Sequence, residues 1–295
     1  MWWRSRRADI GEKQVLSTSG INQNADPSLW REHFFGLSET RWDRLKERSF
    51  WITGAGSGYG QAVALALAAA GSLVFITGRS FQKLEATKLE GFRYKINTEN
   101  LIPVVADITS EADLDSAIKH ISGHTKVLYG LINSAALPQP DVGCFSLSNI
   151  SKNCWNELML TNITAQWLTT RAALPLLTIG KEARVLYLTS EAGWADSLGF
   201  GPYNVSKSAV NSLGASFASE CSAKYPEKDI QINVLVPGEA RTEMNQLSFN
   251  SPFAVVSMVL ALLSHPTNGP NGQFFHRDGR HLSFGYSKIY NRSIL

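Results

Sequence analysis

The chain has 295 residues, of which 18% are charged and 44% are hydrophobic, and its formal net charge is +3. This length suits one large α/β domain with a sizeable core, and the small net charge gives no case for a nucleic-acid partner. The cysteines, Cys144, Cys154 and Cys221, have no metal-ligand spacing and cannot all pair with one another, so a reducing, cytoplasmic setting is the simplest interpretation. The longest apolar runs, 62–70 and 253–263, are too short to span a bilayer.

The start of the chain differs from the rest. Residues 1–27 are polar and aperiodic, and we expect little ordered structure there. Apolar and aromatic side chains between residues 28 and 47 have the spacing of one or two short amphipathic helices. We expect them to pack on the main domain or on a second subunit, because in water they would form a large apolar patch. A membrane-surface helix is the alternative, although acidic residues dilute the basic face that it would need. The chain is therefore divided into an N-terminal extension, 1–47, and a main domain, 48–295.

A glycine-rich turn follows the first predicted strand, Phe50-Trp51-Ile52. Residues 53–60, Thr-Gly-Ala-Gly-Ser-Gly-Tyr-Gly, join this strand to an Ala-rich helix that ends at Gly71. Glycines in such a turn let the backbone approach a pyrophosphate closely, and the helix N-terminus stabilises its negative charge. The turn predicts a dinucleotide site, whose contact residues are Gly54, Gly56, Ser57, Gly58, Tyr59 and Gly60.

The second predicted strand, 73–76, ends at Thr77-Gly78-Arg79. In dinucleotide sites an acidic side chain at this point hydrogen-bonds the ribose 2′-hydroxyl, whereas an arginine accommodates a 2′-phosphate. Because the segment contains no acid, Arg79 favours NADP as the cofactor, with NAD as a possible alternative. A solvated residue at the start of a helix is the other interpretation of Arg79.

Strands and helices continue to alternate along the chain. Helices are expected over 81–89, 112–121 and 152–177, and strands over 101–106, 127–132, 185–189 and 230–236. This alternation predicts right-handed βαβ crossovers and a doubly wound, mostly parallel sheet with helices on both faces, in one α/β domain. Polar or turn residues follow four of the strands, at the edge where open α/β sheets bind their ligands: Asp107, Asn133, Ser190 and Pro237.

A tyrosine and a lysine lie four residues apart near the start of a predicted helix. Tyr203 and Lys207 therefore share one face. A free tyrosine has a pKa of about 10, and a fixed positive charge nearby favours its phenolate, so Tyr203 is a candidate general acid/base. With Ser190 at the end of its strand, three polar groups could meet over one substrate carbonyl. Taken alone the pair is a weak signal, because a surface tyrosine packing on a lysine stem is common.

Between about residues 45 and 285 the chain resembles the short-chain dehydrogenase/reductase family in its single-domain Rossmann form. The resemblance rests on several motifs in the family's order: Thr53-Gly54, Gly58 and Gly60; Asp107; Asn133-Ser134-Ala135-Ala136; Asn162, Ser190, Tyr203 and Lys207; Pro237-Gly238 with Thr242. It implies an NADP(H)-dependent oxidoreductase, a carbonyl reductase or alcohol dehydrogenase. It also implies that Tyr203 transfers the proton, Ser190 orients the carbonyl, Lys207 holds the nicotinamide ribose and Asn162 anchors a water chain.

The resemblance also implies a set of cofactor contacts beyond the glycine turn and Arg79: Asp107, Asn133, Ala135, Tyr203, Lys207, Pro237, Gly238 and Thr242. Local alternatives stay open for some of them. Asp107 and Thr242 could be helix caps, and Asn162 could bridge a helix kink. The chain departs from the family where Tyr59 replaces the usual isoleucine and where Ser134 and Ala136 replace an asparagine and a glycine, all outside the catalytic residues.

The substrate is a small molecule whose identity the sequence does not give. The expected lid, residues 243–251, is short and mostly polar, which favours a polar carbonyl or hydroxyl compound such as a sugar derivative. Three alternatives stay open: a reductase of 3-oxoacyl or other apolar ketones, a non-catalytic nucleotide-binding scaffold, and an epimerase or dehydratase. By resemblance, the helices that hold Asn162 and Tyr203 pair with a second subunit in a homodimer or homotetramer.

The histidines show no paired metal-ligand spacing, so no metal site is expected and all of them are interpreted as structural or surface residues. They are His33, His120, His124, His265, His276 and His281.

Overall fold

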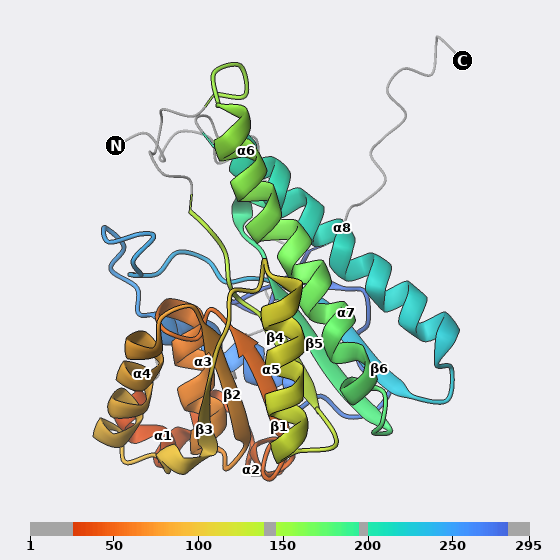
Figure 1. The fold of residues 1–295 in the computed structure, drawn as a ribbon. Coiled ribbons are helices and arrows are strands. Elements are labelled where there is room, and N and C mark those ends of the chain that lie inside the picture. Colours follow the sequence, from red (N-terminus) through yellow and green to blue (C-terminus); the bar gives the residue numbers. More distant parts are fainter. Residues whose placement is uncertain (1–25, 139–145, 195–199, 283–295) are drawn as a thin grey trace, which may run out of the picture.

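The computed structural model describes residues 26–138, 146–194 and 200–282 (Figure 1). At its centre is an eight-stranded sheet with the order β3-β2-β1-β4-β5-β6-β7-β8. Neighbouring strands run parallel except β7 and β8, which are antiparallel. The strands are β1 (Ser49–Thr53), β2 (Leu73–Gly78), β3 (Leu101–Val105), β4 (Gly130–Asn133), β5 (Glu182–Leu188), β6 (Asp229–Val236), β7 (Phe274–His276) and β8 (His281–Leu282). The predicted doubly wound, mostly parallel sheet is confirmed.

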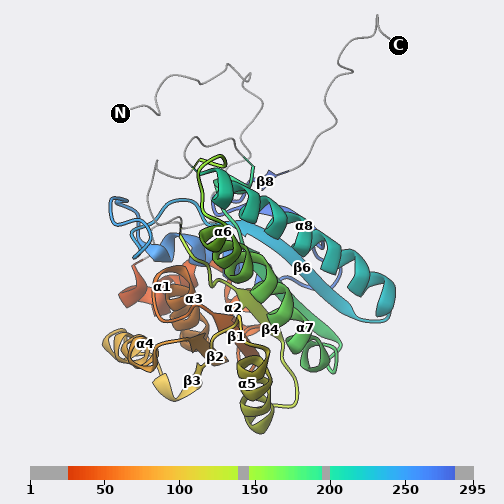
Figure 2. The same cartoon turned by 45° about the horizontal axis from the view of Figure 1, so that its top comes forward.

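Helices cover both faces of the sheet (Figures 1 and 2). One layer contains α3 (Gly58–Ala69), α4 (Phe81–Arg93) and α9 (Val256–Leu263), and the other contains α5 (Glu111–His124), α7 (Ala165–Leu177) and α8 (Gly201–Lys224). Successive strand side chains point to opposite faces. In β1, Phe50 and Ile52 therefore join the core with α3 and α9, while Trp51 joins the core with α5, α7 and α8. Burial on both faces explains why these strands are apolar throughout.

The N-terminal extension packs on the α3 and α9 side of the domain. Its described part forms η1 (Pro27–Leu29), α1 (Trp30–His33), η2 (Phe34–Gly36) and α2 (Glu39–Asp43). Phe35 is 1% exposed, and its ring stacks on Trp42 at 6.2 Å and on Phe253 at 6.1 Å. The Arg41 guanidinium donates to the Ser264 hydroxyl at 3.0 Å. The aromatic cluster is thus part of the domain core. The expectation for residues 1–25 lies outside the described residues.

Several element bounds differ from the sequence prediction, and one hairpin was not predicted. Helix α4 continues past residue 89 to Arg93, because Gly91 does not end it but packs closely on Leu65, where a Cβ would lie 3.1 Å from the Leu65 side chain. Strand β4 begins only at Gly130, since the backbone of Leu128 hydrogen-bonds α7 instead of a neighbouring strand. The hairpin of β7 and β8 was not predicted. Its strands are only three and two residues long, too short for a periodic pattern.

The predicted helix over 152–177 contains an irregular turn. It consists of α6 (Lys152–Met159), a π-helical turn η4 (Leu160–Thr164) and then α7. Such a wide turn often occurs at functional sites, and here it holds Asn162. Among the described helices, none is both long enough and apolar enough to cross a membrane.

Candidate active site

The predicted functional residues meet at the carboxyl edge of the sheet. Strands β1, β2, β4, β5 and β6 run parallel, so the segments that follow them emerge at the same edge. Thr53, the last residue of β1, pairs with Thr77 of β2 on one side and with Asn133 of β4 on the other. Its hydroxyl accepts hydrogen bonds from the backbone N–H groups of Ser134 and Ala135, both at 3.2 Å. The threonine therefore fixes the segment after β4 against the glycine-rich turn.

The glycine-rich turn is shaped by contacts that only glycine allows. Gly54 has a φ of +67°, and a Cβ there would lie 2.7 Å from the Cα of Ala135. A Cβ on Gly60 would lie 2.4 Å from the carbonyl oxygen of Gly54, so α3 approaches the turn closely. Ser57 precedes α3 and makes no capping hydrogen bond with its side chain. The N–H groups of the first turn of α3 thus keep their capacity to bind an anion, which fits a cofactor pyrophosphate.

Tyr59, at the position where an isoleucine is usual, links two parts of the predicted cofactor site. Its hydroxyl donates to the carbonyl oxygen of Gly238 at 2.6 Å. Burial raises the pKa of Tyr59 above its ordinary value, so the hydroxyl stays protonated and the donor is maintained. The turn before α3 and the Pro237-Gly238 segment after β6 are thereby joined by one hydrogen bond.

Two of the predicted cofactor contacts, Asp107 and Arg79, lie close enough for their charges to interact. Burial alone would raise the pKa of Asp107, but hydrogen bonds from Thr109 and the charge of Arg79 hold it below its ordinary value. The Asp107 carboxylate accepts from the Thr109 backbone at 2.9 Å and from its hydroxyl at 2.7 Å. Asp107 therefore shapes its own turn and also faces Arg79, which is exposed. The alternative that Asp107 caps a helix is wrong, because the N-cap of α5 is Ser110.

Tyr203, Ser190 and Lys207 are brought together by α8 and β5. Tyr203 lies in the first turn of α8, and the hydroxyl of Ser190 hydrogen-bonds it. The Lys207 ammonium is 5.6 Å from the centre of the Tyr203 ring and donates to the carbonyl oxygen of Leu188 at 3.2 Å. Only 2% of Lys207 is exposed. Because Tyr203 and Lys207 are four residues apart on α8, both side chains point toward the end of β5.

The protonation of Tyr203 differs from the prediction. Burial raises its pKa to about 12, and the hydrogen bond with Ser190 only partly opposes this rise. Burial also lowers the pKa of Lys207 to about 8. Removing both groups from water disfavours both charges, so Lys207 does not favour the phenolate in this structure. At neutral pH Tyr203 is a neutral phenol that can donate a proton.

Asn162 lies in the π-helical turn and joins three segments. It is fully buried. Its side-chain oxygen accepts from the backbone N–H of Leu137 at 2.7 Å, and its amide donates to the Leu137 carbonyl at 3.2 Å and to the Ser206 hydroxyl at 3.1 Å. Ser206 is on α8 between Tyr203 and Lys207. Asn162 therefore ties the segment after β4 to the helix that carries the predicted acid/base pair.

The sequence analysis missed a cluster of titratable side chains beside Ser190, in which His276 contacts Glu191 and Asp278. His276, at the end of β7, contacts the Glu191 carboxylate at 3.3 Å and the Asp278 carboxylate at 2.8 Å. The hydrogen bond with Glu191 raises the pKa of His276, burial opposes the rise, and Asp278 adds to it. His276 was interpreted as a structural or surface residue, and the structure gives it a particular structural contact. It joins Glu191, the residue after Ser190, to the turn that follows β7. Nothing local signalled the contact with Glu191, since the two residues are 85 positions apart in the sequence.

The segment after β6 folds into a closed loop. The Arg241 backbone donates to the carbonyl of Asn250 at 2.8 Å, and Thr242 forms a bridge with Asn245. Thr242 also lies against the glycine turn, since a Cβ on Gly58 would be 3.2 Å from its methyl group. The apolar side chains of the loop point to solvent; they are Met244, Leu247 and Phe249, which are 47%, 88% and 96% exposed.

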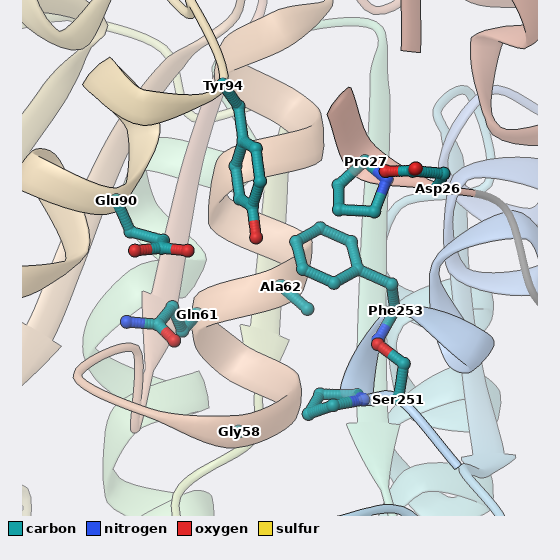
Figure 3. Close-up of a pocket in the computed structure, with 10 residues that line it drawn as sticks. Asp26, Pro27, Gly58, Gln61, Ala62, Glu90, Tyr94, Ser251 and Phe253 are labelled. Atoms are coloured by element: carbon teal, nitrogen blue, oxygen red, sulfur yellow. The ribbon is translucent and has the colours of Figure 1, made fainter. Parts of the chain in front are cut away.

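A cavity of about 390 Å³ lies on the outer side of α3 (Figure 3). Gln61 and Ala62 of α3 form its floor, and Tyr94 and Phe253 point into it with rings 5.9 Å apart and perpendicular. Asp26 of the extension closes one side. Gly58 and Ser251 also line the cavity, so it adjoins the glycine-rich turn at the start of α3, whereas Ser190, Tyr203 and Lys207 do not line it.

Comparison with known proteins agrees with this geometry. Residues 49–252 match the family model described as short chain dehydrogenase. The chain is 24% identical over 253 residues to a 3-oxoacyl-(acyl-carrier-protein) reductase of Aquifex aeolicus, covering 80% of this chain and 98% of that protein. It is 29% identical over 197 residues to a sulfoacetaldehyde reductase of Chromohalobacter salexigens, covering 65% and 72%. The chain belongs to the short-chain dehydrogenase family and is therefore an oxidoreductase by family.

Solved structures share the fold. A short chain dehydrogenase from Pseudomonas syringae has a TM-score of 0.72 at 25% identity, covering 80% of this chain and 96% of that one. Another, from Shigella flexneri and complexed with NADP, has a TM-score of 0.72 at 23% identity, covering 80% and 99%. These matches show that the chain shares the fold of solved short chain dehydrogenases.

Proposed function

We propose that the protein is an NADP(H)-dependent carbonyl reductase or alcohol dehydrogenase. The observation that carries the proposal is the meeting of Ser190, Tyr203 and Lys207 beside the glycine-rich turn. The close glycine contacts and the α3 N-terminus fit a dinucleotide. When bound, the nicotinamide supplies or accepts the hydride, and the protein supplies binding, orientation and the proton.

Each side chain has a distinct role in this proposal. Tyr203, protonated at neutral pH because its pKa is about 12, donates the proton to the carbonyl oxygen during reduction and accepts it from the carbinol in the reverse direction. Ser190 orients the carbonyl oxygen. Lys207, with a pKa of about 8, is mostly charged at neutral pH, and its ammonium has three donors, of which one is bound to Leu188. The others are available for the nicotinamide ribose. Asn162 is a positioning residue that holds α8 against the segment after β4.

Arg79 supports NADP over NAD as the cofactor. It follows β2, is exposed, and no acidic side chain lies among residues 77–79, where a 2′-hydroxyl would be bound. The NADP in the Shigella flexneri neighbour is consistent with this choice. Further proposed cofactor contacts come from Asn133, Ala135, Pro237, Gly238 and Thr242, which all lie at the same edge of the sheet.

Two substrate classes compete. The many polar residues of the loop 243–251 favour a polar carbonyl compound, such as a sugar derivative. The exposure of Met244, Leu247 and Phe249 favours an apolar ketone, because a substrate that covered them would bury apolar surface. The relative from Aquifex aeolicus acts on a 3-oxoacyl group, whereas the sulfoacetaldehyde reductase acts on a small polar aldehyde.

The test is to follow absorbance at 340 nm with NADPH and a panel that contains polar keto sugars, small aldehydes, long-chain 3-oxoacyl compounds and steroid ketones. We expect turnover with at least one class, and about 10²- to 10⁴-fold lower turnover of the same compound in Tyr203→Phe. Preference for the apolar ketones would refute the polar-substrate proposal. Tight binding of NADPH without turnover of any compound would favour a non-catalytic nucleotide-binding scaffold.

We also propose a homodimer or homotetramer assembled through α7 and α8. These helices carry half-exposed apolar side chains, among them Trp167 and Val205, which are each 40% exposed. Burial in a second subunit would remove this surface from water. Sedimentation of the full chain tests the proposal, and a monomer at micromolar concentration would contradict it.

A further inference from the structure

Lys83, in the first turn of α4, forms an ion pair across the carboxyl edge of the sheet. Its ammonium lies 2.7 Å from both carboxylate oxygens of Glu243, which directly follows Thr242 in the loop after β6. The side chains are 53% and 62% exposed. Surface pairs of this kind add little to stability, so the pair is not explained by a need to hold the fold together.

The position of Lys83 relates it to the glycine-rich turn. A Cβ on Gly56 would lie 2.9 Å from the Cβ of Lys83, so the absence of a side chain at Gly56 is what lets the lysine stem lie against the turn. On the other side of the turn, Thr242 packs on Gly58. The Lys83–Glu243 pair therefore links the two segments that flank the turn.

The turn itself contributes no positive side chain. Residues 53–60 are Thr, Gly, Ala, Gly, Ser, Gly, Tyr and Gly. The β2–α4 segment places two cations next to it, Arg79 just before α4 and Lys83 in its first turn. Another cation, Arg277, lies near Gly238 and acts on Tyr59 of the turn. Arg79 is also the residue whose charge acts on Asp107. A phosphate on the ribose would lie at this junction, where one arginine alone would have to offset about two negative charges.

We propose that Lys83 is a second cation for the 2′-phosphate of NADP(H), and that Glu243, in the loop after β6, is an anion that competes with the phosphate for Lys83. This inference rests on the proposed function. A phosphate that takes the Lys83 ammonium must displace the carboxylate, since two anions at one ammonium repel each other. Binding of the phosphorylated cofactor then releases the start of the loop after β6, whereas the unphosphorylated cofactor leaves the pair intact.

The proposal is tested by fluorescence titration with NADPH and NADH at low salt, without a substrate. K83Q should weaken NADPH binding about tenfold and change NADH binding less than about twofold. E243Q should tighten NADPH binding severalfold, because the competitor loses its charge. In K83Q/E243Q the benefit of E243Q should disappear, because it acts through Lys83. The matched control K88Q, five residues further along α4, should leave the NADPH:NADH ratio unchanged.

Several outcomes would overturn it. Equal weakening of NADPH and NADH by K83Q would mean that Lys83 binds the pyrophosphate, which both cofactors carry. Weaker NADPH binding in E243Q would mean that the ion pair holds the loop closed over the cofactor. Adenosine 2′,5′-bisphosphate and AMP provide a second pair of probes without nicotinamide, and equal effects of K83Q on both would also refute the assignment. If the wild-type protein binds neither dinucleotide, the proposed function itself is wrong. If it binds NADPH but K83Q weakens NADPH and NADH equally, only the assignment of Lys83 is wrong.

Discussion

The two ends of the proposed cofactor site, the nicotinamide end and the adenosine end, are built differently, although both lie at the carboxyl edge of the same sheet. At the nicotinamide end, Lys207 is 2% exposed and Asn162 is fully buried, and each has hydrogen-bond partners within the protein. At the adenosine end, Arg79 is exposed and Lys83 is 53% exposed, with its partner Glu243 also in contact with water.

Burial explains what each end can do. At the buried end, desolvation moves the pKa of Tyr203 to about 12 and that of Lys207 to about 8, so protonation is controlled by the protein. At the exposed end water and salt screen the charges, so a change there should alter the affinity for a cofactor by a moderate factor. Changes at the nicotinamide end should therefore abolish chemistry or destabilise the fold, whereas changes at the adenosine end should alter only the choice of cofactor.

The largest effect is expected for Tyr203→Phe. Turnover should fall about 10²- to 10⁴-fold, because the proton donor is lost while ring packing is kept. Steady-state rates and NADPH titration measure the two effects separately, and NADPH affinity should be almost unchanged. Tyr225→Phe, at the end of the same helix, is the control and should keep its turnover. Near-normal rates in Tyr203→Phe would remove the proposed role.

Asn162→Ala should destabilise the protein by about 1–3 kcal/mol, because the part-buried N–H of Leu137 and the buried hydroxyl of Ser206 both lose a hydrogen-bond partner. Urea unfolding measures the change. Asn156→Ala, an exposed position on α6, is the matched control and should change the free energy of unfolding by less than about 0.5 kcal/mol. Equal stability of the two variants would mean that the buried end is not held together by Asn162.

The fold was predictable because its signals are local. Apolar runs, glycine turns and helical periodicity alternate along the chain, and the residue after each parallel strand falls at the same edge. For this reason Ser190, Asn133 and Arg79 could be placed at this edge of the sheet from the sequence alone. The β7–β8 hairpin was not predictable, since its strands are only three and two residues long and β7 pairs with a strand distant in sequence, with Val234 opposite Phe274. The same holds for the aromatic stacking of Phe35 on Phe253.

The chemistry of the site was only partly predictable. The i, i+4 spacing of Tyr203 and Lys207 indicates that they share a face, but their pKa values depend on burial by other segments. Their burial reverses the expectation of a phenolate. Pairs such as Glu191 with His276 and Lys83 with Glu243 join residues far apart in the chain, and only tertiary structure shows them.

At the exposed end, Arg79→Ala should lower the NADPH:NADH affinity ratio about tenfold, which corresponds to about 1.4 kcal/mol. The reason is the loss of a charge-assisted contact to the 2′-phosphate in a solvated setting. The difference should shrink as salt is raised, because exposed charges are screened. Arg93→Ala, at the far end of α4, is the control. An unchanged ratio in Arg79→Ala would contradict the assignment of this end to the 2′-phosphate.

The smallest effect is expected at His276, which lies at the nicotinamide end but on its rim. Its pKa is raised by Glu191 and by Asp278, against burial and the charge of Arg280, so its charged form stabilises the folded state. This stabilisation is fully present below the unfolded pKa of about 6.5 and is lost as pH rises through the folded value. The pKa values of Glu191 and Asp278 are lowered, so their contribution is present above their unfolded values of about 4 and is lost in stronger acid.

His276→Gln should therefore cost the most stability between about pH 5 and 6.5, by about 0.2–1 kcal/mol because Glu191 is partly exposed, and less at higher pH. Urea unfolding of both proteins at pH 5.5 and 8.5 measures the difference. His281→Gln, whose imidazole contacts the neutral Gln273, is the control and should show no such pH dependence. A cost for His276→Gln that is the same at both pH values would mean that packing, and not charge, holds Glu191 beside Ser190. His276 would then resemble the buried end of the site, where contacts inside the protein, such as those of Asn162, set the stability instead of pH and salt.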